Sequence, residues 1–312
     1  MRVVFLGSPD FALPALRALI ERGHEIVGVY TQPDRPVGRG RRTAPPPVKA
    51  LALEHGLRVL QPHSISSPDA VAELRALAPD VAVIAAYGQI LRQRVLDVPP
   101  MGVLNVHASL LPRWRGAAPI PAAILAGDAA TGATIMWVRL ALDAGPMLAR
   151  AEVPISSDDT TATLTARIAE AGARLLVEVL PKWAAGDIEA EEQDEALVTY
   201  APQIKKADAL IDWERDTAET VCRKVRAYNP WPVAYGLLDG QPLRLLECAP
   251  AARPVEADAG TILAAGTGFC IVTADAAVVV ARVQGPGGRP MAAGDYLRGH
   301  RGIIGARLAG RT

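Results

Sequence analysis

The chain has 312 residues, 50% of them hydrophobic, and this length and composition favour two globular domains. The formal net charge is zero at pH 7, so overall charge gives no indication of a nucleic-acid partner. No apolar run is long enough to span a membrane, the start resembles no secretory signal, and the three cysteines form no CxxC pair. We therefore expect a cytoplasmic protein with reduced thiols, without a membrane partner or a structural zinc site.

The first half of the sequence alternates between strands and helices. Residues 3–7 are a short apolar run typical of a buried strand, and Leu13, Leu16 and Ile20 follow at helical spacing. Later elements are a helix at 71–78 and strands at 26–31, 81–87, 103–107 and 133–138. The alternation predicts a doubly wound α/β domain with a mostly parallel sheet, whose ligands bind beyond the carboxyl ends of the strands.

Residues 31–49 form a basic, proline-rich segment, the basic loop, which interrupts this rhythm. The sequence TQPDRPVGRGRRTAPPPVK has Asp34 as its single acid, and its prolines and glycines predict irregular structure. A solvated surface loop is the ordinary interpretation of a charge run. Because this one follows the second strand, beside the expected ligand crevice, we favour a mobile arm for a phosphate-rich partner. Its basic residues are Arg35, Arg39, Arg41, Arg42 and Lys49.

The second half of the sequence has a different character. Residues 186–195, GDIEAEEQDE, are acidic and lack a helical apolar stripe, which predicts a solvated linker. A helix is expected at 217–227, and short strands at 234–238, 243–247, 261–264, 269–273 and 277–283. Strands this short and evenly spaced predict a small β-barrel, OB-like in type. We therefore expect a first domain over 1–189, an acidic linker over 190–206 and a barrel domain over 207–312.

Asn105 and His107 lie at the end of the strand expected over 103–107. Side chains alternate along a strand, so both should face the same side. A lone histidine on a strand is more often structural, but an asparagine beside it at the crevice favours a functional pair, because a buried amide is unfavourable without dedicated partners. Asp143, in the stretch LDAG after the next strand, is the candidate carboxylate to orient the imidazole; alone, it would be interpreted as a turn residue with Gly145.

Other chemistries lack their signatures. Ser109 is not in a GxSxG turn, which argues against a serine hydrolase. The histidines show no HExxH or similar spacing, which argues against a metal site. The first turn reads GSPDF and lacks GxGxxG, the main motif of nicotinamide-dependent enzymes, which argues against that class.

The stretch NVHASLLPRWRGAAPI at 105–120, with LDAG downstream, resembles the folate-dependent formyltransferases. The segments GSPDFALPAL, TQPDRPVGRG, and IDW with YNPWP are similar to the members of that family that act on methionyl-tRNA, and the likeness covers nearly the whole chain. The resemblance implies a Rossmann-like formyltransferase domain and a barrel domain that binds tRNA. It also implies a monomer, without a metal, that transfers a formyl group from 10-formyltetrahydrofolate to the methionine amine of initiator methionyl-tRNA.

The same resemblance implies roles for individual residues. Asn105, His107 and Asp143 match the catalytic residues: the first two would donate hydrogen bonds to the oxyanion of the tetrahedral intermediate, and Asp143 would stabilise the protonated imidazole and relay a proton. AYGQIL at 86–91 would help to wall the pterin pocket. The folate-contacting segment maps onto Ser109, Leu110, Leu111 and Pro112, and the tRNA contacts onto Arg39, as the leading one, with Arg41 and Arg42.

The run around the aspartate departs from the family pattern. It reads MWVRLALDAGPM where the family resembles MxMDxGLDTGDM, so Arg139 and Pro146 each replace an acid, while Asp143 and Gly145 are retained. Two alternatives stay open: an RNA-binding member of the fold that has lost its activity, and a formyltransferase that acts on another amine, such as an amino sugar nucleotide. The basic loop and the second domain favour tRNA as the acceptor, because binding of a small acceptor would require neither of them.

Overall fold

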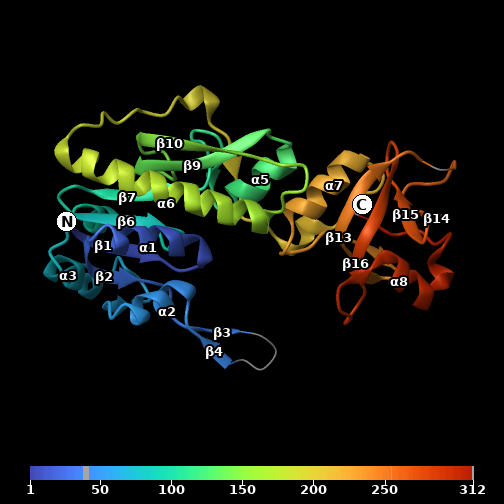
Figure 1. Ribbon diagram of the computed structural model, residues 1–312, viewed down its shortest axis with the longest axis horizontal. Helices are drawn as coiled ribbons and strands as arrows, with labels where there is room; N and C mark the ends of the chain where they lie inside the picture. Colours follow the sequence, from blue (N-terminus) through green and yellow to red (C-terminus); the bar gives the residue numbers. More distant parts are fainter. Residues whose placement is uncertain (38–41, 254, 311–312) are drawn as a thin grey trace. The chain divides into compact units, whose positions relative to one another are not determined.

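Figure 1 shows the computed structural model, which describes residues 1–37, 42–253 and 255–310. It contains two compact units, each assembled from separate stretches of the chain. Unit 1 consists of Met1–Pro119, Ala130–Pro154 and Thr165–Ala201, and unit 2 of Ile120–Ala129, Ile155–Leu164 and Pro202–Thr312. The division that we expected from the sequence, 1–189 and 207–312 joined by a linker, differs from this one, because two short segments within 1–189 pack with unit 2.

Unit 1 is built on a seven-stranded sheet in the order β10-β9-β7-β6-β1-β2-β5. The strands from β7 to β5 pair in parallel, whereas β9 is antiparallel to both of its neighbours. The strands are β1 Arg2–Gly7, β2 Glu25–Tyr30, β5 Val59–Leu60, β6 Val81–Ala85, β7 Val103–His107, β9 Ala130–Trp137 and β10 Met147–Pro154. The mostly parallel sheet predicted from the alternating pattern is therefore confirmed.

Helices cover both faces of this sheet (Figure 1). Val3 and Phe5 of β1 pack with α1, α2 and α6, whereas the alternate residues Val4 and Leu6 pack with α3 and α4. The helices are α1 Leu13–Glu21, α2 Pro47–Glu54, α3 Pro68–Ala76, α4 Gln93–Leu96, α5 Pro119–Ala126 and α6 Thr161–Ala185. The arrangement is doubly wound, as expected. Among the described residues, no helix is both long and apolar enough to cross a membrane.

The ends of the basic loop have regular structure, which corrects the expectation from its prolines. Strand β3 (Arg35–Val37) pairs antiparallel with β4 (Arg42–Ala44). Helix α2 then starts at Pro47, with Pro46 as its N-cap residue. Proline suits the first turn of a helix, because its fixed φ is helical and its missing N–H would have no intrahelical partner. The prolines therefore delimit the segment but do not keep it irregular.

The acidic segment packs on unit 1 and is not a free linker. Strand β11 (Tyr200–Ala201) pairs in parallel with β8 (Arg115–Gly116), and Glu191 forms a backbone bridge with Met147. Its exposed carboxylates form ion pairs: Glu191 with Arg150, Glu192 with Arg139, and Glu195 with Arg115. The sequence pattern does not reveal these contacts, because the arginines lie far away along the chain.

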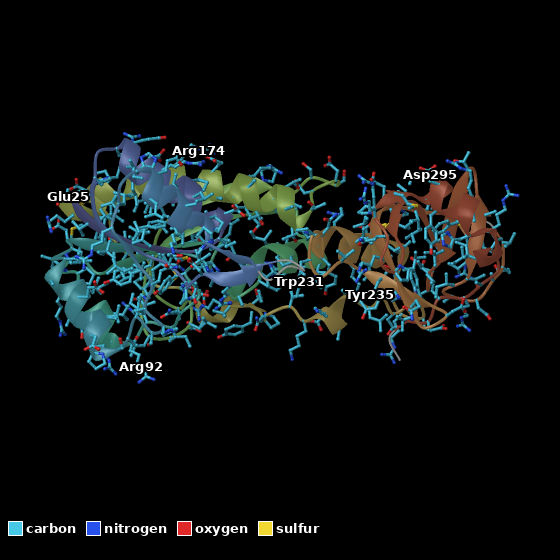
Figure 2. All side chains as sticks on the ribbon, turned by 90° about the horizontal axis from the view of Figure 1, so that it is seen from below. Glu25, Arg92, Arg174, Trp231, Tyr235 and Asp295 are labelled. Atoms are coloured by element: carbon cyan, nitrogen blue, oxygen red, sulfur yellow. The ribbon has the colours of Figure 1, made fainter. Side chains whose placement is uncertain are left out.

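Unit 2 is a curled antiparallel sheet in the order β12-β13-β16-β15-β14, with β17 beside β16. The end of the chain pairs with both edges of the sheet, Ala309 with Leu237 and Arg307 with Thr261. The expected barrel is realised as a curled half-barrel, because β12 and β14 do not pair with each other. Figure 2 shows the side chains, with Tyr235 at the start of β12 and Asp295 in α8. The elements are α7 Ala218–Ala227, β12 Tyr235–Leu238, β13 Gln241–Ala251, β14 Ile262–Ala265, β15 Gly268–Val272, β16 Ala277–Gln284, β17 Met291–Ala292 and α8 Ala293–Gly299.

Helix α7 illustrates why the elements of unit 2 begin where they do. The Thr217 hydroxyl accepts a hydrogen bond from the backbone N–H of Thr220, which caps the helix directly before Ala218. Val221 and Val225 lie on one face at helical spacing and are buried in the core of the half-barrel. The described residues also contain four short 3-10 helices: Asp10–Ala12, Glu195–Leu197, Lys206–Ala209 and Arg301–Ile303.

Candidate active site

Strand β7 directs Asn105 and His107 to the sheet face covered by α3 and α4. Leu104 and Val106 belong to the core on the opposite face, and Val103 to the core beneath α3 and α4. Strand alternation therefore places Asn105 and His107 on the same side as Val103. His107 is buried and Asn105 half-buried. No side-chain hydrogen bond joins the Asn105 amide to another residue in the described part of the chain, so its donors are available to a ligand.

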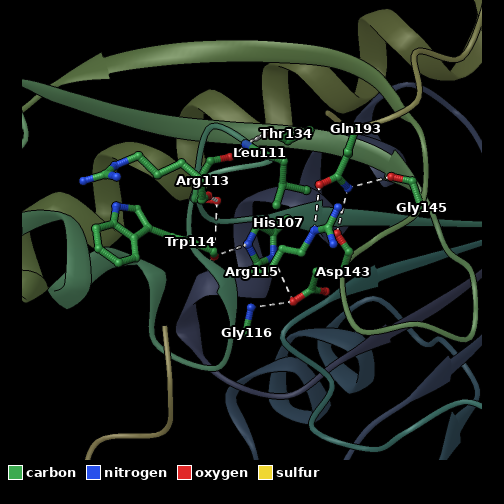
Figure 3. Close-up of polar contacts among 11 residues, drawn as sticks. His107, Leu111, Arg113, Trp114, Arg115, Gly116, Thr134, Asp143, Gly145 and Gln193 are labelled. Atoms are coloured by element: carbon green, nitrogen blue, oxygen red, sulfur yellow. Dashed lines mark hydrogen bonds and ion pairs between the residues drawn. The ribbon is translucent and has the colours of Figure 1, made fainter. Parts of the chain in front are cut away.

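Both ring nitrogens of His107 have a partner (Figure 3). Nε2 lies 3.0 Å from the backbone oxygen of Trp114. A carbonyl oxygen can only accept, so Nε2 carries a proton and donates it. Nδ1 lies 3.8 Å from Oδ2 of Asp143. The residues that we expected to act together from the sequence, His107 and Asp143, thus lie side by side, and a proton taken up at Nδ1 would face a carboxylate.

The backbone of Trp114 is held in an uncommon conformation beside His107. Its φ is 65°, in the left-handed region that residues other than glycine rarely adopt. Its N–H donates to the Thr199 hydroxyl at 2.9 Å, and the Arg113 guanidinium lies 4.2 Å from the centre of its ring. The sequence alone does not decide what the Arg113–Trp114 pair does. In the structure this turn presents a carbonyl to the imidazole.

Asp143 lies in a tightly folded loop, and close backbone approaches require glycine in that loop and in strand β8 beside it. Its φ is 47°, and its Oδ2 atom accepts a hydrogen bond from the Gly116 N–H at 2.9 Å. A Cβ atom on Gly145 would lie 1.7 Å from the Trp137 carbonyl oxygen, and one on Gly116 would lie 2.6 Å from the oxygen of Ala201. Only glycine allows these close approaches, which gives the retained Asp-x-Gly core a structural reason.

Gln193 holds the same loop, although no sequence pattern predicted a role for it. Its Nε2 atom donates to the carbonyl oxygens of Asp143 and Gly145, at 2.7 Å in each case. Its Oε1 atom accepts from Nε of Arg115 at 2.9 Å. Gln193 lies in the segment expected to be a solvated linker, yet it is only 8% exposed. No motif in the sequence marks it; the only available signal was an isolated amide in an acidic run.

The four expected folate-contacting residues form the turn after β7. Ser109 and Leu111 are fully buried: the Ser109 hydroxyl donates to the Arg113 oxygen at 2.6 Å, and the Leu111 N–H to the Thr134 hydroxyl at 3.1 Å. Pro112 is also buried, whereas Leu110 is half-buried. Most of these side chains therefore support the turn. A ligand at this turn would meet its backbone and Leu110.

The expected tRNA contacts are described only in part. Arg39 and Arg41 lie outside the described residues, and Arg42 is the first residue of β4. Lys49, which we counted in the basic loop, donates to both carboxylate oxygens of Asp34, at 2.7 and 2.9 Å. These bonds hold the pKa of Asp34 below its ordinary value of 3.8. The charge of Lys49 is thus balanced by a carboxylate.

Comparison with known proteins places the chain in a family. The profile described as "Formyl transferase" matches residues 1–180, and that described as "Formyl transferase, C-terminal domain" matches residues 203–301. The chain belongs to the formyl transferase family. The methionyl-tRNA formyltransferase of Methylococcus capsulatus is 51% identical to it over 99% of both chains. That of Citrifermentans bemidjiense is 45% identical over 99% of this chain and 98% of its own. These relatives confirm the resemblance found in the sequence.

Solved structures share the fold of this formyl transferase. An N-formyltransferase from Helicobacter canadensis, in complex with folinic acid and dTDP-3-aminofucose, has a TM-score of 0.68 at 14% identity and covers 92% of this chain and 100% of its own. HypX from Aquifex aeolicus in complex with tetrahydrofolic acid has a TM-score of 0.65 at 22% identity and covers 95% of this chain and 47% of its own. At such identities the likeness supports the fold alone.

Proposed function

We propose that this formyl transferase transfers the formyl group of 10-formyltetrahydrofolate to the α-amino group of methionine on initiator methionyl-tRNA. The observation that carries the proposal is the placement of His107 between the Trp114 carbonyl and the Asp143 carboxylate, beside the uncommitted amide of Asn105. The proposal is also supported by relatives named methionyl-tRNA formyltransferase, which are 45–51% identical to this chain over nearly its full length.

The proposed reaction starts from the neutral methionine amine. An α-amino group has an ordinary pKa near 8, and the neighbouring ester lowers it, so much of the amine is neutral at pH 7. The bound folate supplies the formyl group on its N10. The amine nitrogen attacks the formyl carbon, a new carbon–nitrogen bond forms, and the bond from that carbon to N10 breaks. One proton leaves the attacking nitrogen and one is taken up by N10, so the reaction balances without an external reagent.

Asn105 and the His107–Asp143 pair have different proposed roles. Oxyanion stabilisation requires a donor that is not already committed, and the Asn105 amide meets this requirement. His107 already donates from Nε2 to the Trp114 oxygen, so its exchangeable position is Nδ1, which faces Asp143. We therefore assign oxyanion stabilisation chiefly to Asn105, and proton transfer from the attacking nitrogen to the His107–Asp143 pair.

The substrate-binding assignments follow from the resemblance. Folate would lie against the turn of Ser109, Leu110, Leu111 and Pro112, directly after the two catalytic residues of β7. The tRNA would be held by Arg39, Arg41 and Arg42 of the basic loop together with the half-barrel of unit 2.

Formylation of charged initiator tRNA tests this proposal and its alternatives together. The protein is incubated with 10-formyltetrahydrofolate and initiator methionyl-tRNA, the amino acid is released by mild deacylation, and its amino group is analysed. We expect N-formylmethionine. A free amine despite tight tRNA binding would favour an RNA-binding protein without activity. Formylation of an amino sugar nucleotide in preference to methionyl-tRNA would favour another acceptor.

A further inference from the structure

The loop that carries Asp143 does not hold its shape through local sequence preference alone. Asp143 has a φ of 47°, and residues other than glycine keep such a conformation only where their surroundings impose it. The loop also folds so that its Gly145 backbone approaches the Trp137 carbonyl. A small relaxation of this loop would move the carboxylate away from His107. Contacts that fix the loop backbone are therefore candidates for positioning residues.

The Gln193 amide holds that backbone through its two N–H groups, and its oxygen is also hydrogen-bonded (Figure 3). Both N–H groups are used: Nε2 lies 2.7 Å from the Asp143 oxygen and 2.7 Å from the Gly145 oxygen. Its Oε1 atom receives the Arg115 Nε–H at 2.9 Å. A guanidinium only donates and a carbonyl only accepts, so the orientation of the Gln193 amide is fully determined by its partners.

Arg115 is itself held rigidly. It is 2% exposed, and its guanidinium forms an ion pair with Glu195 at 2.8 Å. The next residue, Gly116, donates its N–H to Oδ2 of Asp143. Strand β8 therefore acts on Asp143 twice: on the carboxylate directly through Gly116, and on the loop backbone through Arg115 and Gln193.

We propose that Gln193, oriented by Arg115, is a positioning residue that sets the Asp143 carboxylate for formyl transfer. The inference rests on the proposed function, because it presumes that Asp143 takes part in the reaction. Gln193 touches no reacting atom in this account; it acts through the backbone of residues 143–145. Its removal should therefore slow the chemical step and leave the binding of both substrates nearly unchanged.

The substitution Gln193→Glu isolates this role. It keeps the size of the side chain and strengthens the contact with the Arg115 guanidinium, so the buried arginine stays paired. It removes both N–H donors and places carboxylate oxygens against the carbonyl oxygens of Asp143 and Gly145. The matched control is Gln203→Glu, which makes the same change of charge at an exposed glutamine.

Steady-state kinetics and a double-mutant cycle on the full chain test the proposal. For Gln193→Glu we expect kcat for methionyl-tRNA formylation to fall about 10- to 100-fold, as small misplacements of catalytic groups do. The KM values of both substrates should stay close to those of the wild type and of Gln203→Glu. The melting temperature should fall below that of both, because two buried hydrogen bonds are lost, so kcat is measured at a temperature at which Gln193→Glu is folded. In the Asp143→Asn background, Gln193→Glu should lower kcat further by less than about threefold. Its effect acts through the Asp143 carboxylate, which this background lacks.

Two results would overturn the inference. One is a normal kcat for Gln193→Glu; the other is a full further loss of kcat in the Asp143→Asn background, which would indicate a general structural role. If Gln193→Glu does not fold, Arg115→Lys replaces it, with the same expected loss of kcat and the same dependence on Asp143. A wild-type protein that does not formylate methionyl-tRNA would contradict the proposed function itself, so the two failures can be distinguished.

Discussion

The Nδ1 atom of His107 lies 3.8 Å from Oδ2 of Asp143. This contact joins the end of β7 to the loop whose sequence departs from the family pattern. The departures are accommodated around the contact: the Arg139 side chain forms an exposed ion pair with Glu192, and the Pro146 oxygen accepts the Trp137 N–H. The altered run therefore still places its aspartate beside the imidazole, which favours an active enzyme over an RNA-binding relative that has lost its activity.

Asp143→Asn should slow formylation strongly. The substitution keeps the size of the side chain and an acceptor for the Gly116 N–H, but removes the negative charge that faces His107. General acid–base contributions are about 100- to 10,000-fold, and we expect kcat to fall within that range. Circular dichroism and the melting temperature should match those of the wild type. A kcat within a factor of about two of the wild type would remove the proposed role of the Asp143 charge.

Asn105→Ala should affect kcat more than either KM. If the amide stabilises the oxyanion, its loss costs about 100- to 1,000-fold in kcat, the range measured for oxyanion donors in other enzymes. The side chain makes no hydrogen bond within the described part of the structure, so the fold should be little affected. Steady-state kinetics with each substrate varied in turn provides the measurement. An increase of KM alone would instead assign Asn105 to substrate binding.

Gly145→Ala should disturb the Asp143 loop. The new Cβ atom would lie 1.7 Å from the Trp137 oxygen, so the backbone must move. Overpacking of this kind costs about 1–3 kcal/mol of folding free energy, and the displaced loop should lower kcat as well. Gly302→Ala is the matched control, because a Cβ atom there meets no atom within 4 Å. Equal melting temperatures and rates for the two variants would show that the loop adapts without cost.

Asp275 should contribute to the stability of unit 2 in a pH-dependent way. Its carboxylate accepts the Ala218 N–H at the start of α7 and the Thr273 hydroxyl, and these bonds lower its pKa from 3.8. A lowered carboxyl pKa gives stability that is fully present above the ordinary value and is lost as the pH falls through the folded-state value. Urea unfolding of Asp275→Asn should therefore show lower stability than the wild type at pH 7, with the difference shrinking below pH 3.8. A difference that is independent of pH would contradict this.

Arg39→Ala should weaken the use of tRNA and leave folate binding unchanged. Each phosphate contact that a protein loses reduces the slope of log affinity against log salt by about one. Binding of initiator methionyl-tRNA at several salt concentrations measures that slope. A folate affinity that falls as much as the tRNA affinity would count against the basic loop as a tRNA contact.

The sequence predicted the strand that carries Asn105 and His107 well and the surroundings of Asp143 poorly. Val103, Leu104 and Val106 give Val103–His107 the apolar character of a buried strand, and strand alternation puts Asn105 and His107 on one face. The contacts of Gln193 and Arg115 depend on the pairing of β8 with β11, between segments far apart in the sequence. Propensity and periodicity are local, so they describe residues 190–206 as an acidic linker. The division into units could not be predicted for the same reason, because Ile120–Ala129 packs with residues of unit 2 that lie far away in the sequence.

Single-turnover rates of the wild type and of His107→Ala would show directly whether His107 acts in formyl transfer. The rates are measured for formylation of initiator methionyl-tRNA with both substrates saturating. Saturation removes differences in binding, so the rate reports the chemical step. We expect the wild type to form N-formylmethionyl-tRNA and the variant to be at least about 100-fold slower, with its fold intact. Equal rates, or a wild-type protein that leaves the amine unformylated, would contradict the account.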